Sequence, residues 1–194
     1  MSAISLSAFY NTAYVGIPPS VLTQAISALP IRYEDFTFID HGCGKGHALL
    51  VAAQFPFRRL LGVEIASELC DIARANVDTS PEWAARISIA NQDATSVAYP
   101  DGPLILFFYD PFLPPVLRRV LANLERHLRR SPRPTYLLYA GNPRNPRFKR
   151  VMDSFAFLSE RRDTVYALSP EDAAQDPLHL SEESFTLYSA EIAR

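Results

Sequence analysis

The sequence predicts an α/β fold in which a doubly wound, mostly parallel sheet carries helices on both faces. Two stretches support this. Residues 36–65 follow the order strand, glycine-rich turn, helix and strand, which is the order of a parallel βαβ unit. Residues 104–109 form an unbroken run of apolar and aromatic side chains, typical of a central parallel strand buried on both faces. With 194 residues, 48% of them hydrophobic, the chain can bury one sizeable core.

The N-terminal leader, residues 1–34, is expected to pack against the first strand. It contains the aromatic residues Tyr10 and Tyr14, followed by Pro18 and Pro19. A helix is predicted from residue 20 to residue 29, because apolar side chains there recur at helical spacing, and Ser20 is its expected N-cap.

The turn after the first predicted strand, residues 36–40, is the most informative part of the chain. Gly42, Gly44 and Gly46 stand at alternate positions between this strand and a helix over residues 47–54. Such a turn needs positive φ values, which glycine adopts without steric cost, and a backbone without Cβ atoms lets a ligand lie directly on it. The second strand, residues 60–63, ends in Glu64, whose carboxylate can accept the hydroxyls of a ribose. The unit is therefore predicted to bind a nucleotide.

The spacing of the glycines disfavours two common nucleotide sites. A dinucleotide-binding oxidoreductase needs a third glycine at the sixth position of its motif, where this chain has His47. A P-loop needs Ser or Thr directly after its Gly-Lys pair, whereas Lys45 is followed by Gly46.

Residues 40–46, Asp-His-Gly-Cys-Gly-Lys-Gly, resemble the glycine motif of the class I (seven-stranded, Rossmann-like) S-adenosylmethionine-dependent methyltransferases, in which an acid precedes a Gly-x-Gly-x-Gly turn. The resemblance implies a seven-stranded sheet whose last strand is antiparallel and inserted beside the fifth. It also implies S-adenosyl-L-methionine as cofactor, with Asp40 facing its cationic amino-acid end. The implied cofactor site consists of Asp40, Gly42, Cys43, Gly44, Gly46, Glu64, Ile65, Asp93 and Ala94.

The resemblance covers residues 35–141 well and both ends weakly. It implies one methyltransferase domain over residues 1–194, with a leader (1–34), a cofactor-binding core (35–141) and a C-terminal part of the sheet (142–194). In this family the segment before the glycine turn often lies over the cofactor, so Tyr10, Tyr14 and the turn at residues 16–19 either close the site or simply cap the sheet.

The elements after Glu64 continue the alternation. A helix is expected over residues 67–77, capped by Ser67 and with Leu69, Ile72, Ala73 and Val77 facing the sheet. Residues 78–85, which include Trp83, are expected to form a loop or short turn, and residues 86–90 the third strand. Asp93 follows. The resemblance assigns it to the exocyclic amine of adenine, and the alternative is an N-cap for the small residues after it.

The end of the fourth strand carries the predicted acceptor site. Residues 109–112, Tyr-Asp-Pro-Phe, resemble the acid/Asn/Ser-proline-proline-aromatic motif of amino-group methyltransferases, but lack the second proline. A carboxylate there can accept a hydrogen bond from a nucleophilic N–H group, and an aromatic face can pack on the developing cation. Asp110, Tyr109 and Phe112 are therefore the candidate catalytic residues. The alternative is a proline-containing turn with Phe112 in the core.

The remaining segments complete the sheet. A helix over residues 116–130 presents Leu117, Val120, Leu121, Leu124 and Leu128 inward and several arginines outward, which suit either solvent or an anionic partner. Strands are expected at residues 135–140, 156–166 and 185–192, and a short helix near residues 148–155. Residues 169–183 are expected to form a surface loop with a helical turn.

These features predict a methyltransferase for a nitrogen acceptor, with a protein lysine as first choice because the motifs are similar to those of seven-stranded lysine methyltransferases. An RNA or small-molecule methyltransferase and a catalytically silent S-adenosylmethionine-binding module are the alternatives. The net charge of -2 gives no general reason to expect nucleic acid or a membrane as partner. Cys43 and Cys70 lack metal-ligand spacing, so no metal is expected. Both are expected to be reduced thiols, and the predicted location is therefore cytoplasmic.

Overall fold

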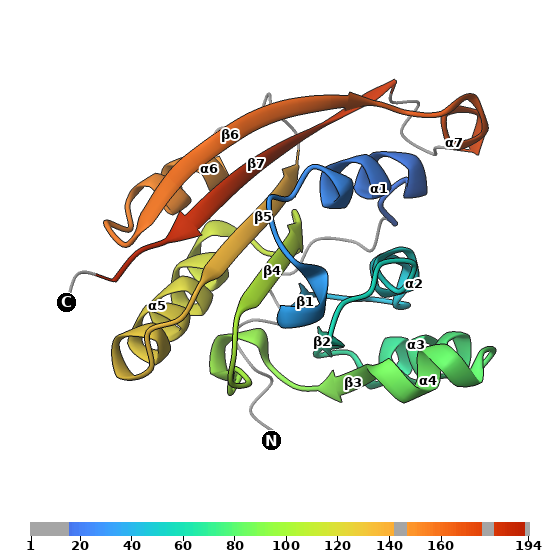
Figure 1. The fold of residues 1–194 in the computed structure, drawn as a ribbon, viewed down its shortest axis with the longest axis horizontal. Coiled ribbons are helices and arrows are strands. Elements are labelled where there is room, and N and C mark those ends of the chain that lie inside the picture. The colour runs from blue at the N-terminus through green and yellow to red at the C-terminus, as the bar shows by residue number, and fades with distance from the viewer. Residues whose placement is uncertain (1–15, 142–146, 176–180, 193–194) are drawn as a thin grey trace, which may run out of the picture.

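The computed structural model describes residues 16–141, 147–175 and 181–192. Its strands form one seven-stranded sheet in the order β3-β2-β1-β4-β5-β7-β6 (Figure 1). Strands β1 to β5 are parallel to their neighbours within that group, whereas β7 is antiparallel to both β5 and β6. The predicted doubly wound sheet with an antiparallel last strand beside the fifth is therefore confirmed. The strands are β1 (Thr37–His41), β2 (Arg59–Glu64), β3 (Ile87–Asn91), β4 (Leu104–Tyr109), β5 (Thr135–Gly141), β6 (Leu158–Ala167) and β7 (Glu182–Ala190).

Helices cover both faces of the sheet. Helices α1 and α2 pack against each other on one face, and α5 packs against α6 on the other (Figure 1). The α-helices are α1 (Pro19–Ser27), α2 (His47–Ala52), α3 (Ser67–Val77), α4 (Pro81–Arg86), α5 (Pro114–Arg130), α6 (Arg147–Asp153) and α7 (Pro170–Gln175). Two 3-10 turns, η2 (Tyr33–Asp35) and η3 (Ala94–Ser96), lie before β1 and after β3. None of the helices in the described ranges has both the length and the apolar character needed to cross a membrane.

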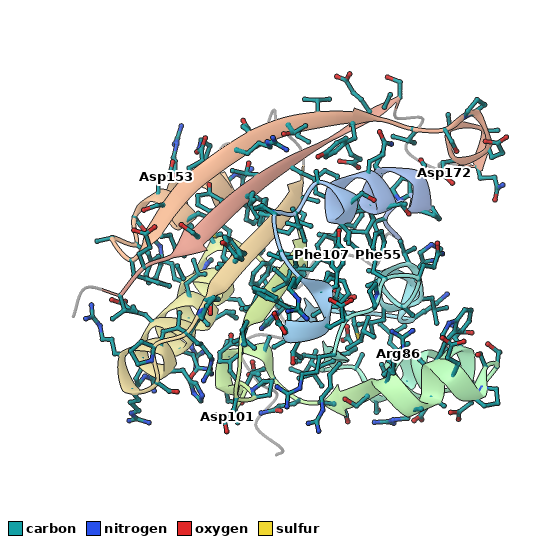
Figure 2. All side chains as sticks on the ribbon, viewed as in Figure 1. Phe55, Arg86, Asp101, Phe107, Asp153 and Asp172 are labelled. Carbon is teal, nitrogen blue, oxygen red and sulfur yellow. The ribbon has the colours of Figure 1, made fainter. Side chains whose placement is uncertain are left out.

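Strand β4 lies between two hydrophobic cores, one on each face of the sheet. Ile105 and Phe107 point into the core beneath α1 and α2, while Leu106 and Phe108 point into the core beneath α5. Figure 2 shows Phe107 in the interior of the molecule. All four side chains are fully buried, so the unbroken apolar run does mark a strand covered on both faces.

Helix α3 ends at Val77 as predicted, but its start and its buried face differ. The N-cap is Ala66, without a side-chain cap, so Ser67 is the first helical residue rather than the cap. Cys70, Ala73 and Val77 are buried, whereas Ile72 is 41% exposed. Residues 81–86 form α4, although residues 78–85 were predicted as a loop or short turn and residue 86 as the start of the third strand. Trp83 of this helix packs partly buried against the core.

Helix α1 is capped by a distant part of the chain rather than by Ser20. It begins at Pro19, so Ser20 already lies inside the helix. The backbone N–H of Ser20 donates to Asp172 Oδ2 at 2.7 Å, and Ser20 Oγ accepts from the backbone N–H of Ser169 at 3.0 Å. Figure 2 shows Asp172 beside α1. One of the orphan N–H groups at this helix start, that of Ser20, is thus satisfied by the connection between β6 and β7.

Candidate active site

The glycine turn has the backbone conformation that its sequence predicts. Gly42, Gly44 and Gly46 all have positive φ angles, of 78°, 51° and 81°. The N–H of Gly42 donates to the carbonyl of Val63 at 2.8 Å, which places the turn at the end of β2. A Cβ atom added to Gly42 would stand 2.7 Å from Pro111 Cβ. The turn therefore lies directly against the segment that follows β4, and only glycine fits there.

Glu64 connects the end of β2 to this turn. Its Oε2 accepts a hydrogen bond from the N–H of Gly44 at 3.0 Å, and its Oε1 accepts from the N–H groups of Ile65 and Ala66 at 2.8 and 2.9 Å. The side chain is buried. A carboxylate offers about four acceptor positions, so one position remains beyond these three bonds. A ribose hydroxyl would meet a carboxylate that the backbone already holds in place.

Asp40 faces a pocket beside the glycine turn. The pocket is lined by Gly16, Ile17, Asp40, Gly42, Cys43, His47, Ala48, Phe107 and Tyr109. Burial, followed by the negative charge of Glu64, raises the pKa of the Asp40 carboxyl to about 8. A cationic group in the pocket would stabilise the ionised carboxylate, so the chemistry of this pocket fits a ligand with a positively charged end.

The leader contributes to the pocket through Gly16 and Ile17. These two residues therefore lie beside the glycine turn, and closure of the leader over a cofactor stays a prediction. Tyr10 and Tyr14, the aromatic residues singled out in the leader, lie outside the described residues. His47, the first residue of α2, also lines the pocket and was not predicted to do so, because its place in the glycine motif served only to disfavour a dinucleotide.

Asp93 is the N-cap of η3. Its Oδ1 accepts a hydrogen bond from the N–H of Thr95 at 2.8 Å, so the N-cap alternative is confirmed. The contact with adenine stays a prediction, and Asp93 follows β3 just as Glu64 ends β2. The neighbouring Ala94 is buried in the core beneath α5.

Asp110 sits in a strained backbone position at the end of β4. Its φ of 44° is positive, which no other non-glycine residue in the described part of the chain shows. Such conformations cost about 1–3 kcal/mol and concentrate at functional sites. Asp110 Oδ1 accepts a hydrogen bond from the Tyr139 hydroxyl at 2.6 Å. Burial raises the pKa of the Asp110 carboxyl, and the bond from Tyr139 partly offsets that rise.

Tyr109 is held by a second long-range hydrogen bond. Its hydroxyl donates to Glu183 Oε1 at 2.7 Å, across 74 residues of sequence. Phe112 is buried in the core beneath α5, and its ring lies close to Gly42 of the glycine turn. Tyr109 lines the pocket, whereas neither Asp110 nor Phe112 is part of its lining.

Tyr139 and Glu183 were not found from the sequence. Tyr139 looks like an ordinary strand residue, and Glu183 lies in a stretch predicted as a surface loop, although β7 in fact begins at Glu182. No local pattern marks either residue as part of a site. The described residues contain no group of three or more histidine, cysteine or acidic side chains able to hold a metal ion.

Residues 38–131 match a family model described as a methyltransferase domain. No curated protein matches the chain in sequence.

Solved structures share the fold at low sequence identity. Protein PH1948 of Pyrococcus horikoshii, provisionally described as an RNA methyltransferase, superposes with a TM-score of 0.63 at 14% identity, covering 90% of this chain and 84% of its own. Geranyl diphosphate C-methyltransferase of Streptomyces coelicolor A3(2) gives a TM-score of 0.58 at 15% identity, covering 90% and 77%. The cyclase SpnF gives 0.64 at 11% identity, covering 91% and 82%. Because these proteins differ in reaction, the shared fold leaves the acceptor open.

Proposed function

We propose that this protein, which belongs to the class I S-adenosylmethionine-dependent methyltransferases and uses S-adenosyl-L-methionine as its cofactor, methylates a nitrogen atom. The amine of a protein lysine is the first choice of acceptor. The observation that carries this proposal is the end of β4, where the part-buried carboxylate of Asp110 stands in a strained conformation next to Pro111, which contacts the glycine turn.

The cofactor would be held by the turn and by the strand ends around it. The positive-φ glycines leave a floor without side chains, and Asp40 supplies a carboxylate for a cationic group. Glu64 and Asp93 stand at the ends of β2 and β3, where the ribose and the adenine are expected. The proposed set is Asp40, Gly42, Cys43, Gly44, Gly46, Glu64, Ile65, Asp93 and Ala94.

The protein's own task in the reaction is positioning and proton removal. S-adenosylmethionine supplies a methyl group that its positively charged sulfur already activates. A nitrogen that gains a methyl group must present a lone pair, so an ammonium acceptor first loses a proton. Asp110 is the proposed proton acceptor, because its raised pKa makes it a stronger base than an exposed aspartate. Tyr109 would orient the acceptor nitrogen, and Phe112 would support the wall of the acceptor site from the core.

RNA is the second candidate acceptor, favoured by the outer face of α5. Exposed arginines gather on this helix, and one of them, Arg129, pairs with Glu125. They are Arg118, Arg119, Arg126, Arg129 and Arg130. The outward placement agrees with the sequence prediction, but exposed aromatic side chains that would stack on bases are absent from this helix. We therefore rank RNA below protein.

The proposed compartment is the cytoplasm. Cys43 and Cys70 are buried free thiols. Unpaired cysteines of this kind suit a reducing environment.

Cofactor binding is tested first, by isothermal titration with S-adenosylmethionine, S-adenosylhomocysteine and NAD in parallel. Both adenosyl ligands should bind at micromolar strength, and NAD should not. Glu64→Gln should weaken the adenosyl ligands by about tenfold, because a charge-assisted contact is lost while the side-chain shape is kept. A folded protein that binds neither adenosyl ligand would contradict the cofactor assignment.

Transfer is tested with labelled S-adenosylmethionine on poly-L-lysine, total RNA and free lysine. Poly-L-lysine should be methylated, and Asp110→Asn should lower turnover by about 100-fold while cofactor affinity is kept. Asn tolerates positive φ, so this change isolates the carboxylate from the backbone strain. Methylation of RNA alone would replace the lysine proposal. No transfer to any acceptor, with cofactor binding intact, would favour a silent module.

A further inference from the structure

The hydrogen bond between Tyr109 and Glu183 fixes the direction of one proton at the pocket. A phenol hydroxyl has one donor hydrogen and can also accept. At 2.7 Å from Glu183 Oε1, the Tyr109 hydrogen points at the carboxylate. A group that enters the pocket lined by Tyr109 therefore cannot receive that hydrogen while it is donated to Glu183.

Glu183 is built into the sheet in a way that holds this geometry. It is only 4% exposed, and its neighbour Ser184 pairs with Gly141 at the end of β5. A buried carboxylate is expensive unless hydrogen bonds stabilise it, so a partner as close as Tyr109 contributes directly to its placement. The antiparallel insertion of β7 beside β5 thus brings an acid from the end of the chain to the end of β4.

We propose that Glu183 is a positioning residue that orients the Tyr109 hydroxyl, and that this orientation selects a methyl acceptor bearing N–H donors. This inference rests on the proposed function and narrows it. Because the Tyr109 hydrogen is committed to Glu183, it cannot stabilise a carboxylate or phosphate oxygen, which can only accept, whereas an amine does not need that hydrogen. Glu183 acts through Tyr109 and need not touch the methyl acceptor.

The orientation is tested without any acceptor substrate. Protein labelled with [¹³Cζ]tyrosine gives one resonance for each tyrosine, and the Tyr109 resonance is assigned by its absence in Tyr109→Phe. Glu183→Ala should move this resonance, and Glu183→Gln, which keeps an acceptor oxygen, should move it less. Glu182→Ala, a change of the same residue type at the exposed neighbouring position, should leave it unchanged. An unmoved resonance in Glu183→Ala would overturn the positioning role.

The selection is tested by transfer from S-adenosylmethionine to poly-L-lysine, with poly-L-glutamate as the acceptor that lacks amine side chains. Glu183→Ala should lower kcat/KM for poly-L-lysine by about tenfold or more, while cofactor affinity stays within about threefold. The double variant with Tyr109→Phe should be no worse than Tyr109→Phe alone, because residues acting through one bond are not additive. Additive losses would overturn the proposal and indicate general destabilisation.

The two proposals fail in different ways. If wild-type protein methylates poly-L-glutamate as well as poly-L-lysine, selection for N–H donors is wrong. If it methylates RNA and not poly-L-lysine, the lysine proposal fails, and kcat/KM for RNA then takes the place of the poly-L-lysine readout in the same double-variant comparison.

Discussion

The site has a proposed cofactor side, comprising the glycine turn and Glu64, and a proposed acceptor side at the ends of β4, β5 and β7, and the two sides hold their carboxylates differently. Glu64 accepts three hydrogen bonds, all from backbone N–H groups, and the most distant donor is 20 residues away. On the acceptor side, Asp110 and Glu183 accept from tyrosine hydroxyls, of Tyr139 and Tyr109, which lie 29 and 74 residues away. Backbone donors are available whatever the side chains are, whereas a hydroxyl donor is lost in a single Tyr→Phe change. The acceptor side is therefore the side that substitutions can retune.

The largest expected effect tests the backbone geometry of the cofactor side. Gly42→Ala should lower the free energy of unfolding by about 3 kcal/mol, because it combines positive-φ strain with a Cβ placed 2.7 Å from Pro111 Cβ. Urea denaturation measures this. Gly102→Ala is the matched control, since Gly102 has a φ of 89° but meets only the flexible end of Arg58, at 3.3 Å. It should cost about 1 kcal/mol. Equal losses in the two variants would show that the contact with Pro111 is unimportant.

A middle-sized effect concerns Asp40, whose pKa lies at about 8 in the folded protein without a cation nearby. If Asp40 faces the cationic cofactor as proposed, binding favours the ionised carboxylate and should release the proton between about pH 6 and 8. Affinity for S-adenosylmethionine should therefore rise with pH in this window, by up to about tenfold per pH unit. Isothermal titration at pH 6, 7 and 8 measures the slope, and Asp40→Asn should flatten it. The same slope in the variant would assign the proton to another group.

The Asp40 carboxyl should also make the free energy of unfolding depend on pH in the absence of any ligand. Its pKa is raised above the ordinary aspartate value, so between about pH 4 and 8 the folded state keeps a proton that the unfolded state releases. The contribution of Asp40 to stability is thus present at low pH and falls as pH rises toward 8. Asp40→Asn should remove that part of the pH dependence in denaturation curves.

The smallest effect tests the acceptor side. The bond from Tyr139 lowers the pKa of Asp110, so Tyr139→Phe should raise it. The acidic limb of the kcat/KM profile should then move to higher pH. On that limb the variant should be about tenfold slower, and on the alkaline side it should match the wild type. Tyr136→Phe, on the same strand, serves as control. A uniform loss at every pH would mean that Tyr139 supports the fold rather than the ionisation of Asp110.

The contrast between the two sides also explains what the sequence could predict. The glycine turn and Glu64 lie within one βαβ unit, so their chemistry and their positions are encoded in neighbouring residues. The alternation of parallel strands and helices also predicts that Asp93 and Asp110 lie at the carboxyl ends of their strands. Tyr139 and Glu183 come near the site only through the pairing of β5 with β7. Residue spacing along the chain does not predict that these two side chains lie there.

Both predicted helix caps were wrong. Ser67 is the first residue of α3, and its N-cap Ala66 makes no side-chain cap bond. In α1 the acceptor is Asp172, 152 residues from Ser20, which no local window could reveal. Propensity alone placed each helix start within a residue and gave the wrong cap.

The bond between Ser20 and Asp172 has a consequence for translation. Its two partners are 152 residues apart, so Asp172 is added to the growing chain long after Ser20. Until then the Ser20 N–H lacks this partner, and Gly16 and Ile17, which lie just before the N-cap Pro18 of α1, lack that anchor beside the pocket. A chain that ends before Asp172 would therefore lack one of the contacts that hold this wall of the pocket.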